Sequence, residues 1–519
     1  IRESKGADNV ILVDAGDNFS GCGAPFYYNF VDTTSAHLYP RLAAYMGYDA
    51  VVSGHSDFEA GHRVYDRVAR EMRKAGVPFL AGNAVSERTG KGYLPAYSIV
   101  RKGGVKVAVL GYTNAANASL MDASCVSGIS FKSLLPLVQE DVDKVRSKEK
   151  PQVVIVVAHT SMGKGDGKNL ERQGLDLFNS LKGVDVLVTG HDHTTKVLKT
   201  DSTVLLDCGR AGQYACLADI KLVVRGGKVI SRSLSGEVES FGSENYDTAM
   251  EEAFKSDYEK VRDFNTSHVG EVKKDLVSRE FYYRQCDYMN FLHALAFSAW
   301  PVDISLSATL LIDGKVPAGE VRYQDIRKIY PYDNKLIVLR LTGAEILRYL
   351  EASYDAWIST VPGPSEGSHV LRITQTKDYA TGGMKWKLAK SPANFDSAAG
   401  IRYTVDVTKP YGSRVTVSGM ADGSPFEMDK DYSVAITSYR STGSGGLMKA
   451  AGLMDARSVE DRIIYRGPEF RTILYRYLKK HVSIDPAVVG DPNVVGSWRF
   501  VPDFAPEAIK ADVELLYGK

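Results

Sequence analysis

The sequence predicts an α/β protein with two domains, a layered sheet domain followed by an α+β domain. At 519 residues the chain is longer than one hydrophobic core usually supports. Residues 1 to 240 alternate apolar strand patterns with amphipathic helix patterns, the βαβ rhythm of a sheet with helices on its faces. A charged stretch without Gly or Pro follows. We therefore expect domains at 1–240 and 267–519, joined by a helical connector at 241–266.

In the first half, strands are expected where Val, Ile and Leu dominate short runs, and helices where apolar residues recur every three or four positions. The helix at 62–76 shows this best, because Val64 and Val68 share one stripe and the helix ends with basic residues before Gly76. In order, the expected elements are strand 10–16, helix 39–47, strand 48–54, helix 62–76, strands 77–83 and 105–113, helix 134–147, and strands 153–159, 184–190 and 203–209.

The connector is expected to be a solvated helix with Ser243 as its N-cap. Beyond it, helix and strand patterns are mixed without a repeating βαβ order, which predicts the α+β class. The expected helices are 285–300 and 344–357, and the expected strands are 302–308, 335–343, 402–408 and 432–439.

The composition excludes several kinds of partner. Lys plus Arg number 64 and Asp plus Glu 63, so no basic field is available to attract a nucleic-acid polymer. No apolar run approaches the roughly 20 residues of a membrane-spanning helix. The five cysteines show no CxxC spacing, and their pattern suggests neither a structural zinc site nor a disulfide framework. The oligomeric state cannot be predicted from these data.

Candidate metal ligands follow three of the expected strands. His191 and His193 come after the strand that ends at Gly190, and in an extended segment residues two apart point to the same side. A pair of surface histidines is the alternative. Asp17 and His159 also follow apolar strands, and ligands of open α/β sheets gather at such carboxyl ends. Histidine with carboxylate favours Zn, Mn or Fe and suits metal-assisted hydrolysis.

The segments DAGD, YDAVVSGHSDFEAG, AHTS, GHDHT, YPYDNKL and SYRSTGSGG together resemble the two-domain 5'-nucleotidase and 2',3'-cyclic-nucleotide phosphodiesterase family of metallophosphoesterases. The resemblance runs nearly end to end. It implies a layered αββα metallophosphoesterase domain with two divalent metal ions, followed by a domain that binds a small nucleotide or nucleoside phosphate. It also implies a location in the periplasm or at the cell surface.

The resemblance assigns Asp17 to the aspartate that bridges both metals, His159 to a single histidine ligand, and His191 and His193 to the GHxH pair. His159 departs from the pattern in following Ala158 rather than Gly. The family's opening DxH motif is not found before Asp17, and we expect the strand that carries it to precede Ile1. One of the two metals would otherwise lack two ligands.

The family's GNHE segment reads Gly54, His55, Ser56 and Asp57 here. His55 replaces the Asn ligand, and its ring either binds the metal or rotates away. Ser56 replaces the catalytic histidine, whose general acid–base help is typically worth ~10²–10⁴-fold. Glu59 occupies the position of the acidic residue that orients that histidine. Shifting the alignment by one residue would make His55 catalytic, but it would put Gly54 at the ligand position.

In the second domain, the resemblance matches Tyr332 and Tyr439 to two aromatic residues that stack the base; core packing is the alternative for either alone. Asn334 is a candidate for reading a base edge, and Arg440 for a bidentate contact with phosphate or carboxylate. Gly443 opens a Gly-rich loop whose backbone can approach a ligand. The family's ribose-binding Asp in this loop is replaced by Gly445, and the Arg that many members carry near 304–311 is missing.

The leading hypothesis is therefore a metal-dependent phosphoesterase of nucleotides, with Asp17, His55, His159, His191 and His193 as metal ligands. Two alternatives remain open. A nucleotide-binding protein that has lost catalysis is consistent with Ser56. A hydrolase of UDP-sugars or of other phosphate esters is consistent with Gly445.

Overall fold

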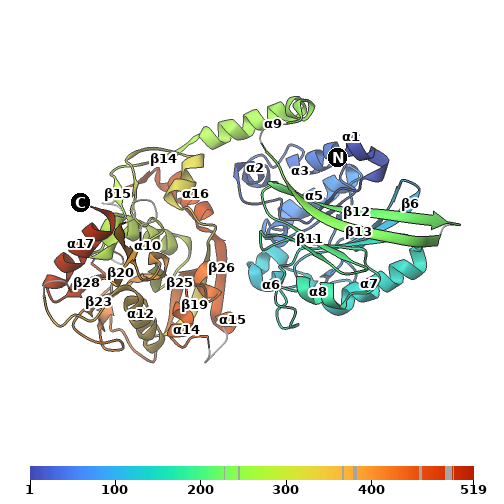
Figure 1. Cartoon of the computed structure of the whole chain (residues 1–519). Coiled ribbons are helices and arrows are strands. Elements are labelled where there is room, and N and C mark those ends of the chain that lie inside the picture. Colours follow the sequence, from blue (N-terminus) through green and yellow to red (C-terminus); the bar gives the residue numbers. More distant parts are fainter. Residues whose placement is uncertain are drawn as a thin grey trace. The chain divides into compact units, whose positions relative to one another are not determined.

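The computed structural model describes residues 1–518 except 227, 243–245, 365–367, 378–382, 455–458, 486–493 and 495. The chain divides into two compact units, Ile1–Arg262 and Asp263–Lys519 (Figure 1). Ser243, the expected N-cap of the connector, lies outside the described residues. Each unit is described here by itself.

The first unit contains two principal sheets. The smaller is parallel, with the order β1 (Val13–Asp14), β2 (Ala50–Val52) and β3 (Phe79–Leu80). The larger has the order β10 (Thr195–Lys199), β11 (Val204–Cys208), β9 (Val186–Thr189), β8 (Val153–Ala158), β6 (Val105–Tyr112) and β5 (Tyr97–Lys102). A short pair, β4 (Ala84–Ser86) and β7 (Ile129–Phe131), accompanies them.

The two sheets are stacked face to face with helices outside. Apolar residues of β2 and β3 share one core cluster with those of β6, β8 and β9. The outer face of the small sheet packs against α5 (His62–Lys74), and the outer face of the large sheet packs against α7 (Leu134–Glu149) and α8 (Gly174–Ser180). This order of layers confirms the expected αββα arrangement. In this arrangement, turns follow the carboxyl ends of β1, β2, β8 and β9.

Strand β8 shows why the apolar runs form strands in this architecture. Val154 and Val156 pack on the helix side of the large sheet, whereas Val153, Ile155 and Val157 pack between the sheets. A strand buried on both faces needs a continuous apolar sequence rather than an alternating one. The expected run at 153–159 therefore forms a strand and ends where His159 begins the turn.

An antiparallel ribbon covers part of the same inter-sheet core. It consists of β12 (Tyr214–Arg225) and β13 (Lys228–Ser240), visible in green in Figure 1. Leu234 is buried in the inter-sheet cluster, with Cys216 and Ala218 packed against it. The sequence analysis located only the strand patterns of β6, β8, β9 and β11 in this region and did not resolve the ribbon.

The connector helix α9 spans Thr248–Thr266 and is not solvated on all sides. Asp257 is buried, receives a bidentate hydrogen bond from Arg41 at 2.7 and 2.9 Å, and accepts a third from Tyr28 at 2.5 Å. Phe254 packs edge-on against Tyr45. Most positions of the helix are exposed, in agreement with the expected solvated helix, but Phe254 and Asp257, three positions apart, form one stripe that contacts Tyr45, Arg41 and Tyr28.

The second unit is a mixed α+β unit built on a five-stranded sheet, as expected. The sheet has the order β22 (Ser397–Ala399), β16 (Ile304–Ser307), β25 (Asp431–Thr437), β19 (Lys335–Thr342) and β26 (Ile463–Glu469). Two smaller sheets contain β24 (Val415–Met420), β23 (Ile401–Asp406) and β28 (Trp498–Val501), and β18 (Gly319–Arg322), β14 (His268–Val272) and β27 (Ser483–Ile484). The longer helices are α10 (Asp287–Ala299), α12 (Gly343–Trp357), α16 (Phe470–His481) and α17 (Phe504–Tyr517).

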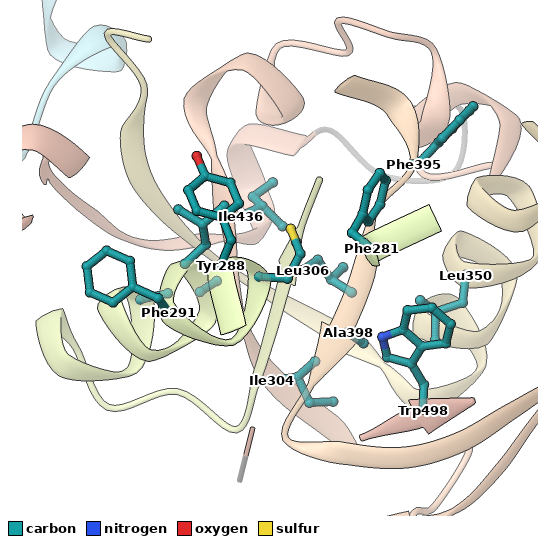
Figure 2. Close-up of a cluster of buried hydrophobic side chains, with 14 of the residues drawn as sticks. Phe281, Tyr288, Phe291, Ile304, Leu306, Leu350, Phe395, Ala398, Ile436 and Trp498 are labelled. Carbon is teal, nitrogen blue, oxygen red and sulfur yellow. The ribbon is translucent and has the colours of Figure 1, made fainter. Parts of the chain in front are cut away.

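One continuous hydrophobic core fills this unit. Figure 2 shows Tyr288 and Phe291 of α10 beside Ile304 and Leu306 of β16, with Trp498 of β28 in the same cluster. All five side chains are buried. None of the helices among the described residues combines the length and the apolar character that a membrane span requires.

Candidate metal centre

Four potential metal ligands meet at the carboxyl ends of neighbouring strands in the first unit. Asp17 lies in the turn after β1, His55 opens α4 (His55–Glu59) after β2, His159 follows β8 and His191 follows β9. Their ligand atoms all lie within 4.8 Å of one another. The side chains thus come from both sheets and meet at one point.

Two glycines allow the turns after β1 and β2 to approach each other. Gly16 has a φ of +95°, and a Cβ there would overlap the backbone nitrogen of Gly54. A Cβ on Gly54 would overlap the carboxylate of Asp17. Asp17 itself has a φ of +66°, a left-handed conformation that Asp tolerates better than most residues. Close backbone approach therefore brings the Asp17 carboxylate toward the ring of His55.

The contacts inside the cluster are short. Asp17 Oδ2 lies 2.8 Å from His55 Nδ1 and 3.2 Å from His159 Nε2. His55 Nδ1 lies 3.2 Å from His159 Nε2 and 3.2 Å from His191 Nδ1. Asp17 Oδ1 accepts a hydrogen bond of 2.8 Å from the backbone N–H of Ser56. Three ring nitrogens and one carboxylate oxygen therefore face a common centre.

The outer hydrogen bonds of two imidazoles assign their tautomers. His159 Nδ1 donates to the carbonyl oxygen of Ala15 at 2.7 Å, and His191 Nε2 donates to Glu171 Oε1 at 3.0 Å. When each ring is neutral, its inward nitrogen carries the lone pair. Histidine ligands of metal sites are commonly fixed in this way by an outer carbonyl or carboxylate.

The protonation of the cluster follows from burial and from the Asp17 charge. Burial alone would raise the pKa of Asp17, but His159 and His55 outweigh it and hold that pKa well below its usual value. Burial acts against the charged form of His159, yet Asp17 raises its pKa to about 9. At His55 burial dominates and lowers the pKa. A cation that binds here therefore displaces a proton from His159.

The donor set fits one divalent ion. Bond lengths of about 2.0–2.1 Å place the ligand atoms of a tetrahedral zinc site roughly 3.3 Å apart. The separations among Asp17, His55 and His159 and between His55 and His191, at 2.8 and 3.2 Å, are close to that spacing, and all four ligand atoms lie within 4.8 Å of one another. Three imidazoles and one carboxylate also match the preference of Zn, Mn or Fe rather than that of Mg or Ca.

His193 does not join the other four residues. His191 and His193 have φ values of +89° and +57°, so the segment after β9 is a left-handed turn and not the extended chain that the sequence argument assumed. The side chain of His193 is exposed. The expectation that both imidazoles reach one point fails for this physical reason.

Ser56 and Glu59 lie in the short helix α4 that His55 opens. Ser56 is buried, and its backbone N–H donates a hydrogen bond to the carboxylate of Asp17. The carbonyl oxygen of Glu59 accepts a hydrogen bond from the thiol of Cys125 at 3.3 Å. Neither residue offers an imidazole, so the position of the family's proton donor carries a hydroxyl.

Asp57 holds the two turns together, a role that the sequence analysis missed. This fully buried carboxylate accepts backbone hydrogen bonds from Gly54 at 2.7 Å, Asp17 at 3.0 Å, Asn18 at 2.7 Å and Phe19 at 3.0 Å. Burial and the nearby Asp17 charge raise its pKa to about 7. An acidic residue three positions after Gly54, at the start of a helix, was the available signal.

Glu171 was also missed, because it lies in a polar loop without a recognisable motif. Its carbonyl oxygen accepts hydrogen bonds from Thr160 Oγ1 at 2.9 Å and from Asn114 Nδ2 at 3.1 Å, and both of these residues are fully buried. These bonds fix the loop so that the Glu171 carboxylate meets His191. No spacing rule connects residue 171 with residue 191.

In the second unit, Tyr332 and Tyr439 flank the same end of the paired strands β19 and β25. Tyr332 precedes β19, Tyr439 follows β25, and these antiparallel strands pair Leu336 with Thr437. The backbone N–H of Lys335 donates to Ser438 Oγ at 2.9 Å. The tyrosines are 48% and 41% exposed, so neither is a core residue. Asn334, two residues beyond Tyr332, is half-buried.

Arg440 is buried, in contrast to the expected ligand contact. It is only 3% exposed, and its guanidinium forms a bidentate pair with Asp396 at 3.1 and 2.6 Å. It also donates to the side chain of Asn394 and to the carbonyl oxygen of Ser444. A bidentate contact with a carboxylate was expected, but that carboxylate belongs to the protein.

Gly445 is enclosed by the same network. It has a φ of +75°, and a Cβ there would overlap Asn394 and the guanidinium of Arg440. Gly443, at the start of the loop, has a φ of +83°. The loop conformation therefore leaves no room for the Asp that the resemblance places at 445.

Comparisons with known proteins agree with this architecture. Residues 267–452 match the family described as 5'-nucleotidase, C-terminal domain. The chain is 22% identical, over 92% of its length, to the trifunctional nucleotide phosphoesterase protein YfkN of Bacillus subtilis, but it spans only 35% of that relative. It is 21% identical to a 5'-nucleotidase of Vibrio vulnificus, over 78% of this chain and 73% of the relative.

Among solved structures, a 5'-nucleotidase precursor of Thermus thermophilus has the same fold, with a TM-score of 0.52 and 20% identity over 97% of this chain and 92% of that one. The resemblance found in the sequence is confirmed. Residues 267–452 of the second unit are similar to the 5'-nucleotidase C-terminal domain, and the chain is similar in sequence to a 5'-nucleotidase and in fold to a 5'-nucleotidase precursor.

Replacing Asp57 tests whether its carboxylate holds the two turns. Asp57→Ala leaves two buried and two partly buried N–H groups without their acceptor, so we expect the free energy of unfolding of the first unit to fall by about 3 kcal/mol or more. Urea unfolding measures this change. The exposed Asp201→Ala serves as the matched control. Equal stability of both variants would contradict the assigned role.

Replacing Glu171 tests the orientation of His191. Glu171→Ala should weaken the binding of Zn²⁺ or Mn²⁺ by about 10–100-fold, because the inward nitrogen of His191 loses its fixed tautomer. Glu171→Gln should recover part of the affinity, since its amide oxygen still accepts from Nε2–H. Titration calorimetry compares the three proteins. Unchanged affinity in the Ala variant would refute this role.

Proposed function

We propose that this chain hydrolyses phosphate esters of nucleotides with the help of a divalent metal ion, as a 5'-nucleotidase or a cyclic-nucleotide phosphodiesterase. The observation that carries the proposal is the convergence of Asp17, His55, His159 and His191 on one point. The same chain continues into a 5'-nucleotidase C-terminal domain. Its curated relatives include nucleotide phosphoesterases and 5'-nucleotidases.

The ion is proposed to be Zn, Mn or Fe, held by Asp17 and the three histidines. When bound, such an ion polarises a phosphoryl oxygen and lowers the pKa of a bound water. Other residues of the chain orient these ligands. The Ala15 carbonyl and Glu171 accept hydrogen bonds from His159 and His191, and Asp57 accepts one from the backbone of Asp17. His193 is not one of these four ligands, and the four hold one ion rather than two.

Proton transfer is the weak step of the proposed reaction. The resemblance places the proton donor at position 56, and the serine hydroxyl there does not titrate near neutral pH. Turnover of esters with poor leaving groups should therefore be slow. The same observation supports the alternative of a protein that binds nucleotides and has lost catalysis.

Substrate recognition is assigned to the second unit. Tyr332 and Tyr439 are exposed at one end of the paired strands β19 and β25, which supports stacking of a base. Asn334 and the loop at Gly443 adjoin them in sequence. Arg440 supports this loop from beneath rather than contacting the substrate. Because no side chain fits at Gly445, the ribose lacks the carboxylate that the family uses. This keeps UDP-sugars and other phosphate esters as candidate substrates.

The resemblance also supports a location in the periplasm or at the cell surface, where the released phosphate and nucleoside are taken up as nutrients. This location belongs to the proposal, as does the identity of the ester.

Metal dependence is the first test of the proposed function. The purified chain, loaded with Mn²⁺ or Zn²⁺, should release phosphate from AMP or from a 2',3'-cyclic nucleotide, and chelation should stop the release. His191→Ala should reduce the rate by about 100-fold or more, because several kcal/mol of transition-state stabilisation depend on the bound ion. His268→Ala, which removes an exposed imidazole of the second unit, is the control.

The same assay separates the alternatives. Protein that binds metal and nucleoside but releases no phosphate from any ester would establish the catalytically inactive alternative. Protein that binds no divalent ion in the wild-type form would reject the proposed function altogether.

Base recognition is tested by truncating the two tyrosines. Tyr332→Ala and Tyr439→Ala should each raise the KM for AMP by about 5–100-fold, since one stacked base is worth roughly 1–3 kcal/mol. The KM for p-nitrophenyl phosphate, which has no base, should change far less. Tyr411→Ala, which removes another exposed tyrosine of the same unit, is the control. Equal effects on both substrates would exclude the stacking role.

A further inference from the structure

Two cysteines of the first unit face each other across the contact between the large sheet and the ribbon. Side chains alternate along β11, so Leu206 and Cys208 point to the same face. Leu206 belongs to the inter-sheet cluster against which Cys216 of β12 packs. The alternation thus directs Cys208 toward the face that β12 covers.

The thiol of Cys216 lies next to the backbone of β11 at Cys208. Cys216 Sγ donates a hydrogen bond to the carbonyl oxygen of Asp207 at 3.2 Å, which places this sulfur against the peptide that precedes Cys208. The two thiols also lie near enough for each to shift the pKa of the other. Both residues are half-buried, so a small reagent can reach them while large ones are hindered.

We propose that Cys208 and Cys216 form a reversible disulfide by exchange with a low-molecular-weight disulfide such as oxidised glutathione. One cysteine thiolate attacks a glutathione sulfur, which forms a mixed disulfide and releases one glutathione thiol. The second cysteine then attacks the protein sulfur of the mixed disulfide and releases the second glutathione thiol. The protein loses two electrons and two protons, and the glutathione disulfide gains them.

Cys216 is suited to be the first nucleophile. The neighbouring Cys208 lowers the pKa of Cys216, whereas Cys216 raises the pKa of Cys208. A thiolate is the reactive form in thiol–disulfide exchange. Cys208 then lies in place to resolve the mixed disulfide.

The other three cysteines lie elsewhere in the described part of the fold. Cys22 is exposed near the start of α2 (Gly23–Phe26), Cys125 donates to the carbonyl oxygen of Glu59, and Cys286 is buried in the second unit. They therefore serve as internal controls. Oxidation should cross-link one specific pair and leave these three thiols reduced or, at the exposed Cys22, capped by glutathione.

The cross-link would lie beside the loop that carries His191. Gly209 donates its N–H to the carbonyl oxygen of Thr194 at 2.7 Å, and Asp207 accepts from Thr189 Oγ1 at 3.1 Å. Cys208 lies between these two anchored residues. The bridge closes a loop of eight sequence positions, and it removes conformational freedom from the unfolded chain rather than from the metal ligands.

The test uses the reduced full-length protein, incubated with oxidised glutathione and then digested under non-reducing conditions. Peptide mass mapping should identify a cross-link between the peptides of Cys208 and Cys216. The unfolding temperature of the first unit should rise by roughly 5 °C and return on addition of dithiothreitol. Cys125→Ser, the matched control, should behave like the wild type in both measurements.

Cys208→Ser should stop at a glutathione adduct on Cys216, with no internal disulfide and no rise in unfolding temperature. The wild-type peptide map decides the question even if a variant fails to fold. The proposal is overturned if Cys208 and Cys216 stay reduced at glutathione concentrations that cap Cys22. It is also overturned if either cysteine pairs with a different one.

Discussion

The candidate metal centre depends on one buried carboxylate that is not itself a ligand. Asp57 accepts four backbone N–H groups, three from the turn after β1 and one from the turn after β2. Without that acceptor, the buried N–H groups of Phe19 and Gly54 would be unsatisfied, at a cost of about 1–3 kcal/mol each. The carboxylate therefore compels two turns from one sheet to lie in van der Waals contact. The glycines at 16 and 54 make this contact sterically possible.

Given that contact, the rest of the centre follows from the stacking of the sheets. The small sheet brings Asp17 and His55, and the large sheet brings His159 and His191. Each sheet alone supplies half a site. Because the inter-sheet core is packed from Val52 and Leu80 on one side to Val109 and Val157 on the other, the two halves are held at a fixed distance. Packing of apolar side chains thus determines the separation of the polar ligands.

Much of this could be predicted from the sequence, and the failures have physical causes. Apolar runs such as 153–159 located strands and the ligands that follow them, because buried strands and their carboxyl ends leave a local signal. His193 was misplaced because a left-handed turn looks like an extended chain in sequence. Glu171 was missed because its role is created by tertiary contacts with Thr160 and Asn114. Arg440 was expected to contact a ligand because its actual partner, Asp396, is distant in sequence.

The enclosed position of Gly445 constrains how the substrate preference of this protein can change over evolutionary time. Arg440 and Asn394 occupy the volume into which any side chain at 445 would grow. A single exchange to aspartate would collide with both, and Arg440 cannot leave without abandoning the buried charge of Asp396. A carboxylate at this place would therefore require coordinated replacements at Arg440, Asn394 and Asp396, and no single substitution could supply it.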